Sequence, residues 1–560
     1  MNIEFSNLDE QITQKLAVIE HERIIERIWE KDFIVWGNDP NEISNRLGWL
    51  DCFEVTKKSF QEINAFVEEV RGEGFTDALL MGMGGSSLAP EVFRLTFGVK
   101  KGYLDLHVLD STHPEAVLEI ENKLDPEKTL YIVSTKSGGT IETMSFMKYF
   151  FTSVSKKLGD IKASRHFIAI TDPGSGLEDI AKTLNFRKIF LNDPDIGGRF
   201  SALSLFGIVP AALIGIDIEK LFESAQSMVN ECNNAEVSKN SGAKLGGIIG
   251  NLAKEGIDKL TFIISPKLKF LGGWLEQLIA ESTGKDGKGI LPVDLEPTIL
   301  VSGYGSDRVF VYLKISGDNV FDGNVSEIKK AGFPTLEIEM ENVYQLGAEF
   351  FRWEFATAVA GYVLEVQPFD QPNVESAKIA ARTMMKEYQE KGKLPELTPT
   401  FNSAEIKIFS DFKTDNPDNV FEMFLSDCIS GKSYAAIHAY LKPDKKIWEE
   451  LQNIRLKILE KNKVATTLGY GPRFLHSTGQ LHKGDGGNGN FIQLISNVKN
   501  DVPIPLEAGK GESSMSFGTL IAAQALGDRQ ALIDNKRRVI TIDLGDKINN
   551  NITSLINSIK

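Results

Sequence analysis

Cysteine is scarce in this 560-residue chain, and its scarcity excludes two kinds of stabilised domain. The three cysteines, Cys52, Cys232 and Cys428, stand singly in the sequence. They are too few for a disulfide framework and lack the paired spacing of a zinc site. We expect them to be reduced thiols in a reducing compartment.

Long apolar runs and an excess of positive charge are also missing. No uninterrupted apolar run reaches the ~18 residues of a membrane span. The formal net charge of −15 argues against nucleic acid or an anionic membrane as a partner. The first residues, MNIEFSNLDEQITQKL, are polar and charged, unlike a signal peptide. We therefore expect a cytoplasmic protein, in which a local cluster of Lys and Arg could still bind a small anion.

The chain contains enough apolar residues to form several hydrophobic cores. With 42% hydrophobic residues, its length predicts roughly three or four domains. The spacing of apolar residues predicts an amphipathic helix over 8–31 and a second helix over 56–71.

From about residue 77 the pattern changes to short apolar segments separated by helical stretches. Strands that are apolar on both faces and alternate with helices predict parallel sheets covered by helices on each side. We predict strands at 78–84, 104–110, 129–135 and 166–171, a helical region over 201–230, and further strands at 259–265, 308–315 and 334–340.

The C-terminal part is predicted to form a separate unit. A buried helix is expected over 350–367, a linker over 390–405, helices over 433–441 and 445–462, and a strand at FIQLIS. The fold class is therefore α/β, with two similar halves and a C-terminal α/β extension. We predict four parts: an N-terminal helical segment (1–70), a first domain with a linking helix (71–230), a second domain (231–395) and the extension (396–560).

Two loops rich in small residues follow predicted strands, at the edge where open α/β sheets bind ligands. In MGMGGSSLAP (81–90), Gly84 and Gly85 allow close approach of an anion, and Ser86 adds a hydroxyl. Its glycines do not form the G-x-G-x-x-G of a dinucleotide site. A helix that starts near Pro90 would add free N–H groups and a positive dipole end.

The second loop, STKSGGTIET (134–143), surrounds a lysine with hydroxyl groups. Packing has no use for so many hydroxyls beside a cation, whereas a phosphate has oxygens for all of them. A third segment, ESTGK (281–285), places one carboxylate among small polar residues, as proton transfer requires. Together the three segments predict an enzyme that acts on a phosphorylated metabolite.

These segments resemble the glucose-6-phosphate isomerase (phosphoglucose isomerase) family, whose two halves are sugar-isomerase (SIS) type α/β domains. The resemblance covers about residues 20–395 and rests on motifs in family order: GGSSLAP, TKSGGTIET, IGGRFS, ESTGK and FDQPNVESAK. The tail motif GYGPRFLHSTGQLHKG and an early segment, RIWEKDFIVWGNDPNEISNRLGWLD, resemble the isomerase half of bifunctional transaldolase/glucose-6-phosphate isomerases. No transaldolase-sized region precedes residue 1, so we expect the free-standing isomerase form.

The resemblance implies reversible isomerisation of glucose 6-phosphate and fructose 6-phosphate in glycolysis and gluconeogenesis. The ring opens, and a proton then moves between carbon 2 and carbon 1 through a cis-enediol(ate). Glu281 would be the base, Arg199 would stabilise charge beside the reacting carbons, and Lys378 would lie near the substrate. The residues implied to hold the substrate are Gly85, Ser86, Thr135, Lys136, Ser137, Thr140 and Gln371.

One family feature is out of place. The family uses a histidine shortly after the glutamate to open the ring, but no histidine lies between Glu281 and His438 here. We hypothesise that His476, in FLHSTGQ of the extension, takes this role with Lys378 as its partner. His482 is the competing candidate, and we expect it to face solvent. In dimeric relatives the neighbouring subunit supplies this histidine, so an extension that folds back would allow a monomer as well as a homodimer.

Two alternatives stay open. Another SIS-type phosphosugar isomerase would share the phosphate loops, and a non-catalytic regulator that binds sugar phosphates could dispense with the base. Neither the enediol route nor any histidine spacing calls for a metal or a cofactor, and we predict none.

Overall fold

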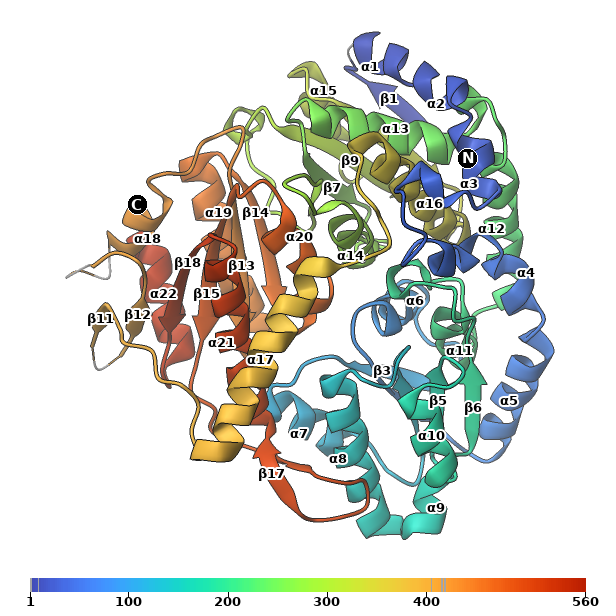
Figure 1. Cartoon of the computed structure of the whole chain (residues 1–560), viewed down its shortest axis with the longest axis vertical. Helices are drawn as coiled ribbons and strands as arrows, with labels where there is room; N and C mark the ends of the chain where they lie inside the picture. Colours follow the sequence, from blue (N-terminus) through green and yellow to red (C-terminus); the bar gives the residue numbers. More distant parts are fainter. Residues whose placement is uncertain (1–2, 9, 404, 414–415, 417–418, 560) are drawn as a thin grey trace.

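The computed structural model describes residues 3–8, 10–403, 405–413, 416 and 419–559. It contains three helix-covered sheets, one in each of three successive parts of the chain (Figure 1). This arrangement confirms the predicted α/β class. Among the described residues, no helix combines the length and apolarity needed to cross a bilayer.

The first sheet is entirely parallel, with strand order β3-β2-β4-β5-β6. Apolar strands in its centre are buried on both faces, as the sequence predicted. Its strands are β2 (Asp77–Met81), β3 (Asp105–Leu109), β4 (Thr129–Ser134), β5 (Phe167–Thr171) and β6 (Lys188–Leu191). The helices of this part are α4 (Cys52–Lys57), α5 (Phe60–Gly72), α6 (Leu88–Phe97), α7 (Pro114–Lys123), α8 (Ile141–Leu158), α9 (Asp160–Ser164), α10 (Gly176–Thr183), α11 (Leu205–Leu213) and α12 (Ile218–Cys232).

The second sheet has the order β1-β10-β9-β7-β8 and is parallel except for its edge strand β1. Its strands are β1 (Ile3–Ser6), β7 (Lys259–Ile264), β8 (Leu291–Val293), β9 (Arg308–Ile315) and β10 (Thr335–Met340). The helices are α13 (Ser241–Lys254), α14 (Leu271–Thr283), α15 (Asp322–Lys330), α16 (Leu346–Leu364) and α17 (Pro372–Lys391).

The third sheet has the order β11-β12-β18-β15-β13-β14, with a parallel centre and two antiparallel strands at one edge. Its strands are β11 (Phe401–Asn402), β12 (Lys407–Phe409), β13 (Tyr434–Tyr440), β14 (Ala465–Tyr470), β15 (Gly489–Ile495) and β18 (Arg538–Asp543). A separate hairpin joins β16 (Pro503–Pro505) and β17 (Ser513–Ser516). The helices are α18 (Val420–Leu425), α19 (Lys445–Asn462), α20 (Gly479–Gly484), α21 (Phe517–Asp534) and α22 (Ile548–Ser558).

Two predicted helices were wrong. The segment 433–441 contains the interior strand β13, and all seven residues of that strand are buried between β14 and β15. The predicted single helix over 8–31 is instead three short helices, α1 (Glu10–Lys15), α2 (Ala17–His21) and α3 (Ile24–Trp29). Arg23 separates the last two in a left-handed conformation, which turns the buried isoleucines of both toward the core.

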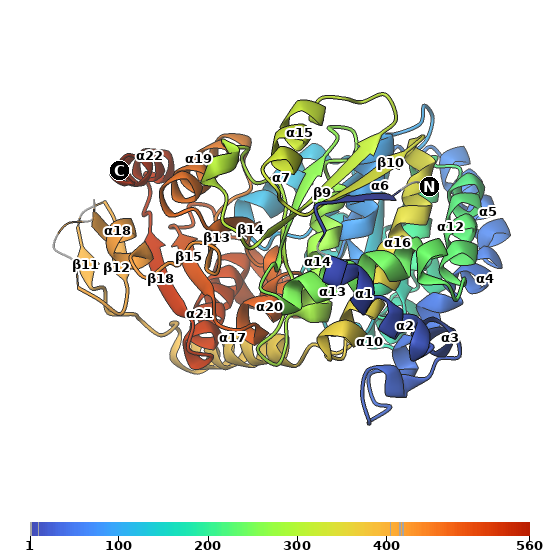
Figure 2. The same cartoon turned by 90° about the horizontal axis from the view of Figure 1, so that it is seen from above.

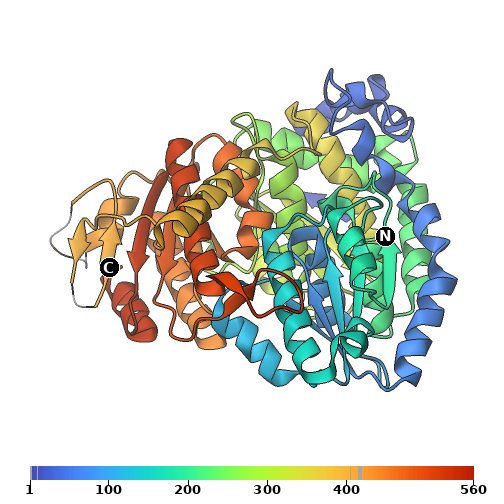
Figure 3. The ribbon, with the colours of Figure 1, turned by 60° about the horizontal axis from the view of Figure 1, so that its bottom comes forward.

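The C-terminal unit packs directly on both other parts of the chain. Figure 2 places it at one end of the molecule and the N-terminal helices at the other. Figure 3 shows the β16–β17 hairpin against the helices of the first sheet, where Ile504 and Phe517 join the core around Phe146. Each sheet lies within one predicted domain, apart from β1, which joins the second sheet from the N-terminal segment. The domain boundaries themselves stay predictions.

Candidate active site

The two predicted phosphate loops lie side by side. One follows β2 and the other follows β4, and these strands are parallel neighbours. Because their carboxyl ends meet at one edge of the sheet, the loops touch there: the Ser134 hydroxyl donates to the carbonyl of Ser86 over 3.2 Å. A single-turn helix, η4 (Gly84–Ser86), leads from the first loop toward α6.

The second loop presents hydroxyl groups at the start of a long helix. The hydroxyls of Thr135 and Thr140 lie 3.1 Å apart, and Ser137 accepts from the N–H of Gly139 over 3.2 Å. Thr140 precedes α8 and makes no capping hydrogen bond with its side chain. The first N–H groups of α8 and its positive dipole end therefore face this loop. The ammonium of Lys136 lies at the same edge, bonded to Asp172 and to the carbonyl of Pro194.

Two glycines bring other segments against the first loop. A Cβ on Gly85 would lie 1.9 Å from the carbonyl oxygen of Gly198, in the turn that carries Arg199. Gly84 has a φ of +55°, and a Cβ there would lie 2.8 Å from both the amide nitrogen of Gln277 and the carbonyl oxygen of His476. Only glycine allows these approaches, so the first loop, the GGR turn, α14 and the C-terminal unit meet at one point.

Arg199 is buried at this point, with 4% of its surface exposed. It lies in the single-turn helix η5 (Gly198–Phe200). Its guanidinium donates to Ser282 over 2.9 Å and to Glu281 over 3.4 Å. It also donates to the side chain of Gln371 over 3.1 Å and to two carbonyls of the 368–370 turn over 2.8 Å each. The motifs IGGRFS, ESTGK and FDQPNVESAK are thereby joined by one side chain.

Glu281 lies in the last turn of α14 and is 4% exposed. Gln277, one helical turn earlier, donates to its carboxylate over 3.2 Å. Burial raises the pKa of Glu281, while the charges of Arg199, His476 and Lys378 and the bond from Gln277 pull it down. A buried carboxylate whose basicity is raised, next to a fixed cation, can take a proton from carbon and return it.

His476 reaches this site from the C-terminal unit of the same chain. Its Nε2 lies 3.0 Å from the carboxylate of Glu142, the glutamate of STKSGGTIET. Gln524 of α21 donates to the same carboxylate over 2.6 Å and accepts from Thr112 over 2.9 Å. Burial disfavours ionised Glu142, but the charge of His476 and the hydrogen bond from it keep the carboxyl pKa below its ordinary value. Glu142 thus fixes the orientation of a half-buried imidazole.

His482 does not face solvent, so that prediction was wrong. The side chain is 1% exposed, and its Nδ1 lies 3.2 Å from Nε2 of His438. The neighbouring Lys483 is also buried, because its ammonium bonds Asp528 over 2.8 Å. His482 and Lys483 are therefore part of a polar cluster inside the C-terminal unit.

Lys378 lies in α17, the helix that follows Gln371. Its charge lowers the pKa of both Glu281 and Glu142, so its ammonium acts on both carboxylates of the site. Lys285, the lysine of ESTGK, is 2% exposed and donates to the carboxylate of Asp370 over 2.6 Å. It anchors the turn before α17 rather than facing the loops.

Three residues of the site were not singled out from the sequence: Glu142, Gln277 and Gln524. Two of them carried a signal. Glu142 lies inside a motif already identified as functional, and Gln277 precedes Glu281 by the four residues that place side chains on one helical face. Gln524 lies in α21, outside every site motif, and its sequence context offers no signal.

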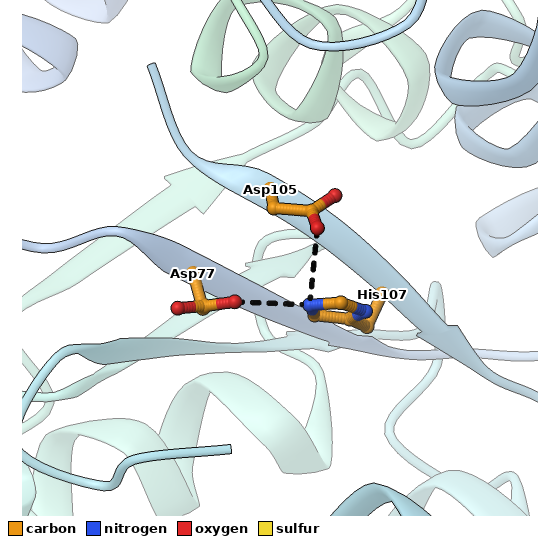
Figure 4. A group of neighbouring side chains, drawn as sticks. All are labelled: Asp77, Asp105 and His107. Atoms are coloured by element: carbon orange, nitrogen blue, oxygen red, sulfur yellow. Dashed lines mark hydrogen bonds and ion pairs between the residues drawn. The ribbon is translucent and has the colours of Figure 1, made fainter. Parts of the chain in front are cut away.

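One cluster of metal-ligating residue types occurs elsewhere in the described structure. Asp77, Asp105 and His107 approach one another at the amino ends of β2 and β3 (Figure 4), the edge opposite the phosphate loops. His107 pairs with Asp77 over 3.0 Å and with Asp105 over 3.7 Å. These contacts account for the cluster without an ion, and we assign no metal to it. The absence of a metal cofactor stays a prediction.

Comparisons with known proteins agree with this geometry. Residues 51–294 match the family described as phosphoglucose isomerase. A probable glucose-6-phosphate isomerase of Methanococcus maripaludis is 29% identical over 401 residues, which cover 64% of this chain and 86% of that protein. A glucose-6-phosphate isomerase of Mycoplasmopsis pulmonis is 29% identical over 379 residues, covering 59% and 88%. The crystal structure of a glucose-6-phosphate isomerase from Chlamydia trachomatis shares the fold, with a TM-score of 0.60 at 18% identity over 69% of this chain and 89% of that one.

Proposed function

We propose that this chain, a member of the phosphoglucose isomerase family, interconverts glucose 6-phosphate and fructose 6-phosphate. The observation that carries the proposal is the buried pair of Glu281 and Arg199 beside two phosphate loops. The family match includes both residues and both loops. The glucose-6-phosphate isomerases named above are aligned over most of their length, which supports the same activity here.

The loops would bind the phosphate of the sugar. The hydroxyls of Ser86, Thr135, Ser137 and Thr140 can donate to its oxygens, and the start of α8 adds N–H groups and a positive dipole end. Lys136 would contribute positive charge at the same edge. A phosphate held there fixes the sugar relative to the base, which is the main requirement of a one-base proton transfer.

Glu281 would move the proton. Its carboxylate takes the proton from carbon 2 of the open-chain aldose, which gives the enediol(ate). A proton passes from the oxygen on carbon 2 to the oxygen on carbon 1, and Glu281 returns its proton to carbon 1 to give the ketose. Negative charge that develops on the sugar oxygens is stabilised by the Arg199 guanidinium, which stays protonated. Gln371, which Arg199 holds, would contact the substrate from the other side of the cation.

His476 would open the sugar ring before this step. Its imidazole can transfer a proton at the ring oxygen, and Glu142 holds the ring of the side chain in place. Lys378 would support the open-chain oxygens from α17. Because one chain supplies every residue of this set, we propose that a monomer suffices for activity; a homodimer would be compatible with the same site. The relation of the tail to bifunctional transaldolase/glucose-6-phosphate isomerases stays a prediction.

The direct test is conversion of fructose 6-phosphate to glucose 6-phosphate by the purified protein, with excess chelator and no added cofactor. The Glu281→Gln variant should retain sugar-phosphate binding, measured by calorimetry, and lose ~10²–10⁴-fold in turnover. Asp286→Asn is the matched control, because Asp286 is an exposed carboxylate five residues downstream in a left-handed conformation that asparagine accepts. Its turnover should equal that of the wild type.

The same experiment separates the alternatives. Tight sugar-phosphate binding without turnover of either hexose phosphate would support a regulator. Turnover of a different sugar phosphate would support another SIS-type isomerase. The buried position and raised pKa of Glu281 favour an enzyme, because a binding module gains nothing from a desolvated base.

A further inference from the structure

The C-terminal sheet has a cavity at the carboxyl ends of its strands β13 and β14. Its volume is about 620 Å³, and it is lined by residues of all three sheet-bearing parts of the chain. It lies at the carboxyl edge of these parallel strands, which is the edge where open α/β sheets bind ligands.

The cavity is separate from the isomerase site. Neither Glu281 nor Arg199 lines it. The segment 473–478 forms the wall between the two, because Phe474 and Ser477 line the cavity while His476 turns to Glu142 on the other side.

Asp294 supplies a buried acceptor in this cavity. It is 8% exposed and follows β8. Its Oδ1 has no hydrogen-bond partner within the part of the chain that the structure describes. Gly272 makes room for the carboxylate, since a Cβ there would lie 2.0 Å from this oxygen. A buried carboxylate oxygen left without a donor is costly, so a ligand that donates to it gains affinity.

His482 supplies a second acceptor. Nδ1 of His438 lies 3.2 Å from the carboxylate of Asp528, which stays ionised beside Lys483, so this nitrogen carries the proton and donates. Nε2 of His438 must then accept from Nδ1–H of His482, 3.2 Å away. This chain of bonds leaves Nε2 of His482 without a proton, so its lone pair can accept a hydrogen bond. The atom has no partner among the described residues.

The remaining lining combines carboxyl groups with aromatic surface. Glu91, Asp110 and Glu276 add three carboxyl groups, of which Glu91 is paired with Arg94 over 3.1 Å and Asp110 with Arg473 over 3.2 Å. Burial and the neighbouring Asp294 raise the pKa of Glu276 to about 8, so this carboxyl lacks a sufficient counter-charge.

The rings of Trp448 and Tyr470 line the same cavity and are stacked with centroids 6.0 Å apart. Aromatic faces attract organic cations, and carboxylates pair with them. In the described part of the chain, the residue groups that could hold a metal ion do not include any of these carboxyls. The lining therefore matches an organic cation rather than a metal ion.

We propose that this cavity binds a small organic amine in its ammonium form. An ammonium group has three donors and no acceptor, which complements the free atoms of Asp294 and His482. Its apolar body would lie against the rings of Trp448 and Tyr470. This site is independent of the isomerase reaction and gives the C-terminal unit a binding function of its own.

The test compares two probes of the same shape, phenethylamine and 2-phenylethanol, titrated into the full-length protein by calorimetry. We expect the amine to bind ~10- to 100-fold more tightly than the alcohol, because a charge-assisted hydrogen bond contributes about 1.5–3 kcal/mol. Asp294→Asn should remove this difference. Equal affinity for the two probes, or no saturable binding of the amine, would overturn the proposal.

Two further variants keep the result interpretable. Trp448→Phe removes the fluorescent ring at the cavity without removing a charge; it should abolish the amine-dependent fluorescence change and preserve preference for the amine. Glu281→Gln should bind phenethylamine as the wild type does, whatever happens to turnover. If Glu281→Gln loses amine binding, the amine occupies the isomerase site and the assigned cavity is wrong. Should Asp294→Asn unfold, Glu276→Gln provides a second variant that removes a carboxyl group from the cavity, with the same expected loss of preference.

Discussion

Replacing Glu142 with glutamine tests whether the imidazole of His476 acts through its carboxylate partner. The substitution keeps the shape of the side chain and the bond from Gln524, but it removes the charge that His476 contacts at 3.0 Å. Hydrogen bonds to charged groups contribute about 1.5–3 kcal/mol. If this energy supports the proton transfer that opens the ring, turnover of the cyclic substrate should fall ~10- to 100-fold.

The readout separates ring opening from the later proton transfer. Initial rates are measured with cyclic glucose 6-phosphate and with an open-chain analogue of the aldose phosphate. Glu142→Gln and His476→Ala should both slow the first reaction and leave the second within about twofold of wild type, since Glu281 and Arg199 are unchanged. Equal losses on both substrates would refute the ring-opening role and indicate a general disturbance of the site.

A double variant tests whether the two residues form one unit. If Glu142 acts only by orienting His476, adding Glu142→Gln to His476→Ala should cost nothing further. If the double variant instead loses turnover by the product of the two single losses, this reasoning is contradicted. Glu121→Gln is a matched control: its carboxylate also accepts hydrogen bonds from residues of α8, Tyr149 and Ser153, but away from the loops, so turnover should not change.

The remaining predictions concern packing, stability and pH. Gly85→Ala should reduce kcat/KM and leave the protein folded by circular dichroism, because the new methyl would displace the GGR turn, 1.9 Å away at its carbonyl; unchanged kinetics would mean that this contact does not position Arg199. Asp528→Asn should lower the free energy of unfolding by about 3–5 kcal/mol in guanidinium titrations, since it leaves the buried charge of Lys483 unpaired. Burial opposes the charge of Asp528, but Lys483 and His438 hold its folded-state pKa well below the ordinary range. Its contribution to stability is therefore present above the unfolded carboxyl pKa of about 3.9 and is lost as the pH falls toward the folded value. Burial raises the pKa of Glu281 in the free protein, so the acid limb of the kcat/KM profile should lie above the ordinary glutamate value of about 4.3; a limb at or below it would contradict the buried base.

The central strands were predictable because their environment is uniform. β2, β4 and β5 are apolar along their length and buried on both faces, and a parallel sheet then dictates that the loops after β2 and β4 share an edge. The same uniformity misled the prediction for 433–441. A strand covered on both faces has no alternation, and SYAAIHAYL contains enough alanine to resemble a buried helix.

The error at His482 has a different origin. A histidine followed by lysine usually lies at the surface, because an unpaired ammonium is too costly to bury. Here Asp528, in a helix 45 residues downstream of Lys483, neutralises that ammonium and accepts from His438 as well. Sequence patterns reflect the preferences of neighbouring residues. The burial of His482 and Lys483 depends instead on Asp528, which only the packing of α21 against α20 brings close.

The position of His476 depends both on a recognisable sequence motif and on packing between distant parts of the chain. Its motif indicated a role in ring opening, and the structure brings it to a glutamate 334 residues away in the chain. That meeting depends on how the C-terminal unit docks. One docking contact comes from a residue outside every site motif, because Gln524 of α21 bonds both Thr112 and Glu142. A loop motif can therefore suggest which residues belong to a site, while the docking interface decides whether they meet. For this reason we expect Gln524, which lies outside the site motifs, to matter more for ring opening than its sequence context suggests.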